Sequence, residues 1–121
     1  MYVIRAMGIE DVEKVARMVA LDHDRNLEKG CRIAKEHTLC HLKIVPQHCY
    51  VLEDGEGSIV GAMILHPREE IFEIEDFHIK DVQRNKEALK ILKGKLMEYL
   101  ENLGTEVLCC PYVLKRLMQE T

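Results

Sequence analysis

The sequence lacks tryptophan, and only 5% of its residues are aromatic. Surfaces that bind nucleic acid bases by stacking need aromatic rings, so a site of that kind is not expected. Basic tracts are also missing, and the formal net charge is −4. Because phosphate backbones bind to positively charged stripes, we expect no nucleic acid partner.

Long apolar runs are absent as well. A helix that crosses a bilayer needs roughly 20 predominantly apolar residues, and no stretch of the chain approaches that length. The first residues, MYVIRAMGIEDVEK, do not combine a basic start with a long apolar run, so they do not indicate a signal peptide. We therefore expect a cytoplasmic protein without a membrane partner.

Cysteine pairs of the CxxC type are missing, and the number of cysteines is odd. Reduced, buried thiols are therefore expected rather than a disulfide framework. His37 and His41 lie four residues apart in a helical pattern, which could suit zinc together with Cys40, His48 and Cys49. That spacing matches no standard zinc module, so no metal is expected.

The residues that are present fit one compact domain over 1–121, of which 47% are apolar. Apolar spacing and turn residues predict a β-α-α-β-β-β-α-β-α order, with helices on both faces of a mixed sheet in an α+β fold. The predicted elements are a strand at 2–6, helices after Gly8 and at 27–44, strands at 49–53, 58–66 and 71–79, a helix through Leu89 that Gly104 caps, a buried strand at 105–110, and a short helix after Pro111.

The strand at 71–79 changes phase along its length. Phe72 and Ile74 are apolar at even positions, whereas Phe77 and Ile79 are apolar at odd positions. Side chains of a regular strand alternate strictly between two faces, so one face cannot hold both pairs without an extra residue. The pattern predicts a β-bulge near 75–76; a strand buried on both faces is the alternative.

Three segments, in this order, resemble the GNAT superfamily of acyl-CoA-dependent N-acyltransferases. They are YVIRAMGIEDVEKVARMV, CYVLEDGEGSIVGAMILHP and EIEDFHI, and the resemblance extends from Tyr2 to about Met118. It implies a GNAT-like sheet whose last two strands are missing, acetyl-CoA as the acyl donor, and the amine of a small molecule or peptide as the acceptor.

The resemblance also implies where the cofactor binds. In the family, an R/Q-x-x-G-x-G/A turn and the following helix N-terminus hold the CoA pyrophosphate, because unpaired amides and the helix dipole attract anions. Aligned from Arg84, this turn has Glu87 and Leu89 in place of both glycines; aligned from Gln83, it has Lys86 and then Ala88, which the pattern allows. The candidate pyrophosphate site is therefore Gln83, Arg84, Lys86 and Ala88.

The resemblance places the chemistry on the strand at 71–79. A carboxylate there can take a proton from the acceptor amine, which must be neutral to attack. Glu75, next to the predicted bulge, is the first candidate base, and Glu73 is the second. The backbone amides of Phe77 and Ile79 are expected to polarise the acyl carbonyl.

Two functions follow from these residues. The first is direct acetyl transfer from acetyl-CoA to an amine. The alternative is a non-catalytic GNAT-like binding or assembly module, which the glycine-poor turn and the missing strands favour. Because no further strand would cover the strand at 105–110, it would form an apolar edge of the sheet. We therefore expect a homodimer that uses residues 105–118.

Overall fold

The computed structural model describes residues 1–22, 26–101 and 103–119. Five strands of these residues form one sheet in the order β1-β2-β3-β4-β5. Neighbouring strands are antiparallel from β1 to β4, and β5 is parallel to β4. The strands are β1 (Val3–Ala6), β2 (Cys49–Glu53), β3 (Ile59–Pro67), β4 (Ile71–Ile79) and β5 (Glu106–Cys109).

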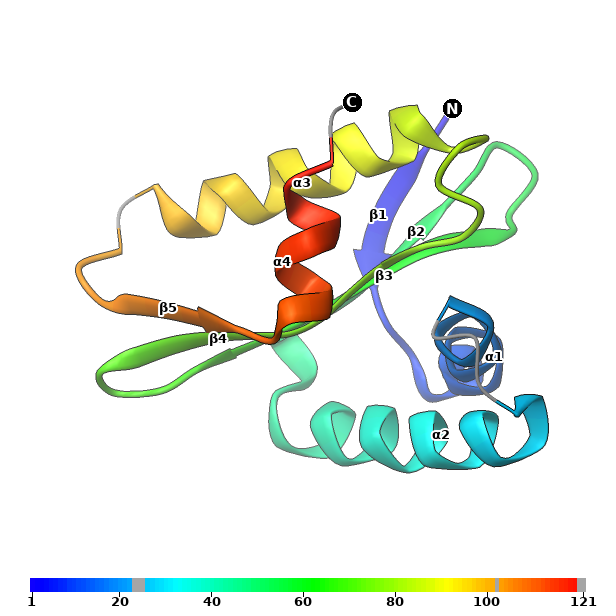
Figure 1. Ribbon diagram of the computed structural model, residues 1–121, viewed down its shortest axis with the longest axis horizontal. Helices are drawn as coiled ribbons and strands as arrows, with labels where there is room; N and C mark the ends of the chain where they lie inside the picture. Colours follow the sequence, from blue (N-terminus) through cyan, green and yellow to red (C-terminus); the bar gives the residue numbers. More distant parts are fainter. Residues whose placement is uncertain (23–25, 102, 120–121) are drawn as a thin grey trace.

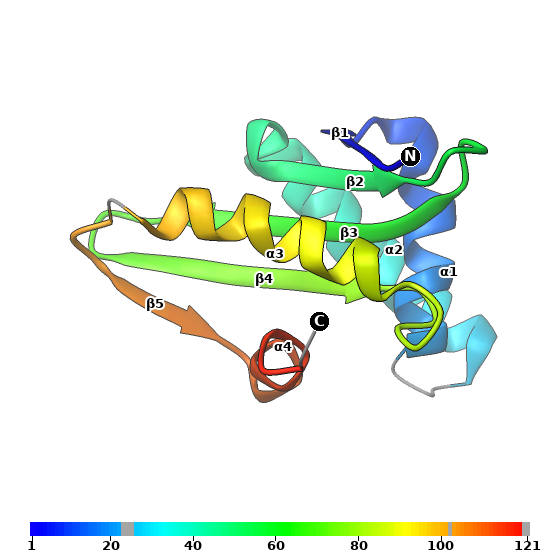
Figure 2. The same ribbon diagram turned by 90° about the horizontal axis from the view of Figure 1, so that it is seen from above.

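Helices cover both faces of the sheet, as predicted. Figure 1 shows α1 and α2 on one side of the strands and α3 and α4 on the other, and Figure 2 shows α4 near the β5 edge. None of the described helices is long and apolar enough to cross a bilayer. The helices are α1 (Val12–Asp22), α2 (Leu27–Ile44), α3 (Lys86–Leu100) and α4 (Pro111–Leu117), with 3-10 turns η1 (Ile9–Asp11) and η2 (Pro46–His48).

Apolar side chains form a separate core on each face. On the α3 side, Phe77, Ile79, Leu89 and Leu92 are buried together. On the α1 side, Val15 packs with buried residues of β2 and β3. The helical stripe read from the sequence of α3 therefore faces the sheet, since its leucines at spacings of three and four residues lie on one face.

The predicted β-bulge is confirmed. In the antiparallel register of β3 and β4, Ile64 pairs with Asp76 and the next residue, Leu65, pairs with Ile74. Glu75 is therefore the extra residue of β4 and has no opposite residue on β3. The bulge explains how Ile74 and Phe77, at positions of opposite parity, both belong to the core on the α3 side.

Two expectations about the C-terminal part and one about the cysteines are wrong. The helix α3 ends at Leu100, so Gly104 does not cap it. The parallel strand β5 is exposed rather than buried, because it lies at the sheet edge and its side chains at Val107 and Leu108 are 45% and 55% exposed. All five cysteines are free, but Cys49 alone among them is buried.

A bidentate ion pair secures the entry into α1. The Arg5 guanidinium donates to both carboxylate oxygens of Asp11, at 2.7 and 2.8 Å, and the backbone N–H of Gly8 donates to the same carboxylate at 2.8 Å. Asp11 is only 4% exposed. The hydrogen bond from Arg5 lowers the pKa of Asp11, and the bond from Gly8 acts in the same direction despite the burial.

We predict that Asp11→Asn lowers the free energy of unfolding by about 1–3 kcal/mol near neutral pH, because it removes charge-assisted hydrogen bonds from a buried position. The lowered folded-state pKa means that the Asp11 contribution is complete above the unfolded-state pKa and is lost as pH falls through the folded-state pKa. Urea unfolding of the unaltered protein and of the Asp11→Asn variant should therefore give free energies of unfolding whose difference becomes smaller below about pH 4. A difference that does not depend on pH would contradict a stabilising role for the ionised Asp11 carboxylate.

The homodimer stays a prediction, and the exposed edge strand β5 is its basis. Unpaired edge strands with apolar side chains invite pairing with another chain, and α4 adds Leu114, which is 52% exposed. We expect static light scattering to give twice the chain mass of 14.0 kDa, and Leu108→Lys to shift the mass toward the monomer. A monomeric mass for the unaltered chain at micromolar concentrations would refute the dimer.

Candidate active site

The bulge directs two consecutive carboxylates of β4 toward the same helix. Oε1 of Glu75 lies 3.6 Å from Nε2 of His41, and Oδ2 of Asp76 lies 3.0 Å from Nε2 of His37. Both histidines belong to α2 and are one helical turn apart, so they share a face of that helix. In a regular strand, neighbouring residues would point to opposite faces.

Glu75 is largely enclosed, with 19% of its side chain exposed. The same Oε1 that faces His41 lies 3.6 Å from Nδ1 of His66, on β3. Burial raises the pKa of Glu75, and the nearby carboxyl of Glu73 raises it further. A raised carboxyl pKa lies closer to the neutral range in which a general base works best.

Glu73 has different surroundings, although it is only two residues away. Its carboxylate accepts a hydrogen bond from Arg68, whose side chain is 53% exposed. The interaction with Glu75 lowers the pKa of Glu73, and the Arg68 hydrogen bond lowers it too. Of the two predicted candidates, Glu75 therefore has the environment of a base and Glu73 that of a surface ion pair.

A cleft opens where β4 and β5 separate. The register of the two strands ends where Ile74 is opposite Cys109, one residue before the bulge. A hollow of about 340 Å³ lies where this register ends. Its walls consist of residues from both strands and the following link, namely Glu73, Ile74, Glu75, Leu108, Cys109 and Cys110.

The amides of Phe77 and Ile79 lie along the same edge of β4. Lys80 donates its backbone N–H to the carbonyl of Val60 on β3, at 2.8 Å. Amides along an antiparallel strand point alternately to either side, so those of Phe77 and Ile79 point away from β3. Because the β5 register ends at Ile74, this stretch of edge lies beyond the paired part of β5.

The predicted pyrophosphate turn leads directly into α3. Asn85 is the N-cap residue, but its side-chain amide donates to the carbonyl of Lys80 at 2.6 Å and caps no amide of the helix. The first amides of a helix have no intrahelical acceptors. Ala88 is fully buried beneath this turn, while the candidates Gln83, Arg84 and Lys86 are exposed at the surface, as is Glu87.

A buried ionic chain, which the sequence did not predict, continues from Asp76. His78 is 1% exposed and bonds Asp76 through Nε2 at 2.9 Å and Asp22 through Nδ1 at 3.0 Å. Ionised carboxylates only accept hydrogen bonds, so both ring nitrogens of His78 donate. The ring is then doubly protonated and positively charged. His78 is therefore part of the interior, although it lies next to the end of β4.

The pKa values of His78 and Asp76 in this ionic chain follow from their hydrogen bonds. Burial by itself would lower the pKa of His78, but the bonds to Asp22 and Asp76 outweigh burial and raise it. Burial would raise the pKa of Asp76, but the bonds from His37 and His78 lower it instead. The hydrogen bonds therefore favour the charged form of His78 between the two carboxylates.

Asp22 extends the ionic chain from α1 to α4. Its carboxylate accepts hydrogen bonds from the hydroxyl of Tyr112 and, at 2.9 Å, from Nη2 of Arg116. Burial and the bond to Asp22 raise the pKa of Tyr112 to about 12. This tyrosine is therefore a poor proton donor near neutral pH.

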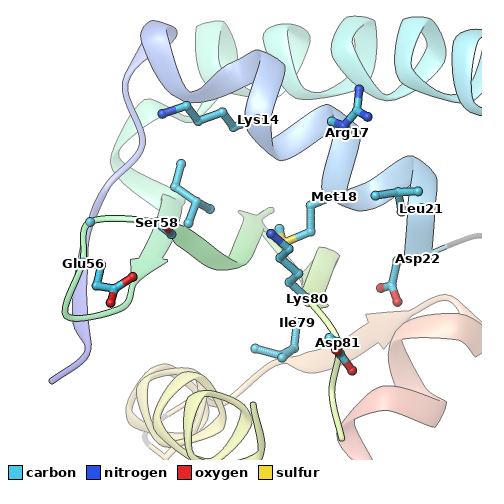
Figure 3. Close-up of a pocket in the computed structure, with 12 residues that line it drawn as sticks. Lys14, Arg17, Met18, Leu21, Asp22, Glu56, Ser58, Ile79, Lys80 and Asp81 are labelled. Atoms are coloured by element: carbon cyan, nitrogen blue, oxygen red, sulfur yellow. The ribbon is translucent and has the colours of Figure 1, made fainter. Parts of the chain in front are cut away.

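A larger hollow, of about 830 Å³, lies at the opposite end of β4 (Figure 3). Side chains of α1 and of the end of β4 face it from two sides, with the β2–β3 turn beside them. Its charges are mixed, which does not favour a polyanion, and it does not include Glu75. The charged residues that line it are Lys14, Arg17, Lys80, Asp22, Glu56 and Asp81.

The zinc ligands considered from the sequence are not assembled as one group. Cys49 is buried and donates its thiol to the carbonyl of Val45 at 3.3 Å, and burial raises its pKa to about 11. His48 contacts the ring of Tyr99 instead. His37 and His41 do come together, but with Glu75. The i, i+4 histidine pair and the bulge were both visible in the sequence, whereas their proximity was not.

Similarity to known proteins is confined to structure, since no family model and no curated protein matches the sequence. Ard1 from Thermoplasma volcanium superposes with a TM-score of 0.67 at 16% identity, over 86% of this chain and 66% of that one. Naa20 from Chaetomium thermophilum, in complex with a bisubstrate analogue, gives 0.58 at 18% identity, over 80% and 55%. The chain has the GNAT fold.

The GNAT fold was the expected one, and its extent differs between neighbours. A predicted acetyltransferase from Clostridium acetobutylicum, with acetyl-CoA, gives a TM-score of 0.63 at 10% identity, over 100% of this chain and 92% of that one. The chain spans less than two thirds of the length of Naa20 and just under two thirds of that of Ard1.

Proposed function

We propose that this protein transfers an acetyl group from acetyl-CoA to an amine, with Glu75 as the general base. The observation that carries the proposal is the position of Glu75. It is the bulge residue of β4 and lines the hollow that opens where β4 and β5 separate. The GNAT fold of the chain, shared with a neighbour that holds acetyl-CoA, supports this donor.

The structure supports a path for the cofactor along β4. Phosphates would bind at the N-terminus of α3, where the uncapped amides and the helix dipole favour anions, with Lys86 and Arg84 as nearby cations. Gln83 and Ala88 complete the turn. From there the edge amides of Ile79 and Phe77 lead toward the cleft, and they would donate to the acyl carbonyl as its oxygen becomes negative.

The chemical step is a direct displacement. Glu75 accepts a proton from the ammonium group, and the neutral nitrogen attacks the thioester carbonyl. A C–N bond forms and the C–S bond breaks. CoA leaves as a thiolate that takes up the second proton of the nitrogen as the amide forms, and Glu75 releases the first proton to solvent. A small molecule or a peptide could supply the amine, and the Naa20 neighbour with its bisubstrate analogue supports an acceptor of this class.

A non-catalytic GNAT-like binding or assembly module is the second candidate. The observation that favours it is Glu87, a carboxylate in the first turn of α3 where the family pattern aligned from Arg84 has a glycine. Its negative charge near a pyrophosphate opposes binding by about 1 kcal/mol. A module of this kind would retain the fold and bind no acetyl-CoA.

We expect acetyl-CoA to bind with a micromolar dissociation constant in calorimetric titration and to raise the melting temperature, because a ligand of the native state stabilises it. Glu87→Gln should tighten binding about fivefold through loss of one negative charge, about 1 kcal/mol. The matched control is Glu98→Gln, an exposed position at the other end of the same helix. Absence of binding at millimolar acetyl-CoA would leave only the binding module.

For the chemical step, we predict that Glu75→Gln lowers kcat by about 10²–10⁴-fold while the dissociation constant of acetyl-CoA stays the same. Glu70→Gln, in the exposed β3–β4 turn, is the control and should leave kcat unchanged. Glu73→Gln should have a small effect, since that carboxylate bonds Arg68. Acetyl transfer to a panel of amines and N-terminal peptides provides the rate, and an equal loss in both Glu73 and Glu75 variants would contradict Glu75 as the sole base.

A further inference from the structure

A group of metal-binding side chains lies on the α2 side of the bulge. One ring nitrogen from each of His37 and His41 and one carboxylate oxygen of Glu75 all lie within 4.8 Å of one another. We propose that these three residues bind a divalent transition-metal ion of the zinc class. Two imidazoles and one carboxylate are a ligand set that zinc accepts, with a fourth position open to water or a substrate.

The separation between His41 and Glu75 suits a small tetrahedral ion. Zinc bonds of 2.0–2.2 Å place neighbouring ligand atoms about 3.3–3.5 Å apart. Nε2 of His41 and Oε1 of Glu75 are 3.6 Å apart, which is too long for a good hydrogen bond and close to that value. The remaining ligand, His37, has a side chain that is 41% exposed, so it has room to adjust.

The other nitrogen of each imidazole already has a partner. Nδ1 of His41 lies 3.1 Å from the backbone carbonyl of His37, to which it can donate, and this leaves the lone pair on Nε2 toward Glu75. Nε2 of His37 is 3.0 Å from Asp76, which accepts its proton and leaves the lone pair on Nδ1. Metal-bound histidines generally donate their second N–H to a carbonyl or carboxylate in this way.

A neighbouring orphan atom supports the same conclusion. Nδ1 of His66 is buried without a hydrogen-bond partner among the described residues, and it lies 3.6 Å from Oε1 of Glu75. Buried polar atoms normally have a partner. Water that completes the coordination of the metal, or His66 itself after a small rotation, would satisfy this nitrogen.

Access to the ion is available from the helix side. A cavity of about 180 Å³ between α1 and α2 is lined in part by His37 and Asp76. The surrounding charge also favours a cation, because Glu73, Glu75 and Asp76 follow one another closely on β4.

The metal has a consequence for the reaction that rests on the proposed function. A carboxylate bound to zinc is a much weaker base, because the cation favours its ionised form. Occupancy of the site would therefore inhibit acetyl transfer, and a chelator would restore it. Binding itself is independent of any activity and is measured without acetyl-CoA.

The test uses Co²⁺ as a spectroscopic substitute for zinc, after alkylation of the exposed thiols Cys40 and Cys110. The unaltered chain should saturate at one Co²⁺ per chain, with visible absorption typical of tetrahedral coordination. We expect His41→Ala and Glu75→Gln each to weaken binding at least about tenfold. His37→Ala should also weaken binding. Because His37 is more exposed than His41, this variant is expected to fold, and circular dichroism checks that it does.

His48→Ala is the matched control, because His48 lies outside the group and contacts Tyr99. This variant should bind Co²⁺ like the unaltered chain. Absence of saturable binding at millimolar Co²⁺, or an equal loss in the His48 variant, would overturn the site. Absorption from thiolate-to-cobalt charge transfer would also overturn it, since the ligands would then be cysteines. If the metal-free protein has no acetyl transfer activity, the result on Co²⁺ binding still holds, because binding is measured without acetyl-CoA.

Discussion

The single extra residue in β4 is the constraint on which the site depends. Without the bulge, strict alternation would place the side chains of Phe77 and Ile79 on the face opposite Phe72 and Ile74, and the core under α3 would lose half of its β4 contribution. The bulge restores those residues to the core. As a direct consequence, Glu75 and Asp76 both reach α2, where two histidines one turn apart receive them.

Such an arrangement requires that the buried charges satisfy one another. Desolvation of a carboxylate in a protein costs several kcal/mol unless hydrogen bonds and opposite charges offset it. Asp76, His78 and Asp22 meet that condition through an unbroken chain of hydrogen bonds that ends at Arg116 on α4. Because these hydrogen bonds join α1, β4 and α4, they also hold α4 beside the sheet. Glu75 is the member of this region with the weakest contacts, which leaves it available for chemistry.

Periodicity predicted much of this fold. The bounds of α2 agree with the expected 27–44, and the phase change in β4 located the bulge, because both patterns depend on local geometry. Long-range contacts were beyond such reasoning. The burial of His78 depends on Asp22, 56 residues away. The exposure of β5 depends on its place at the sheet edge, which its apolar composition does not reveal.

In the candidate site too, sequence patterns reveal features within one helix or strand but not the contacts between them. Glu75 is a candidate base because it adjoins the bulge predicted from the sequence, and the histidine pair stands out because four residues make about one helical turn. Neither pattern states which strand faces which helix, so a base and a pair of zinc ligands were considered separately. The fold brings them within 4.8 Å, and one carboxylate becomes the only group that belongs to both. Proton transfer and metal binding compete for that carboxylate, because a bound cation opposes its protonation. The balance between them depends on the metal concentration and on whether an amine occupies the cleft.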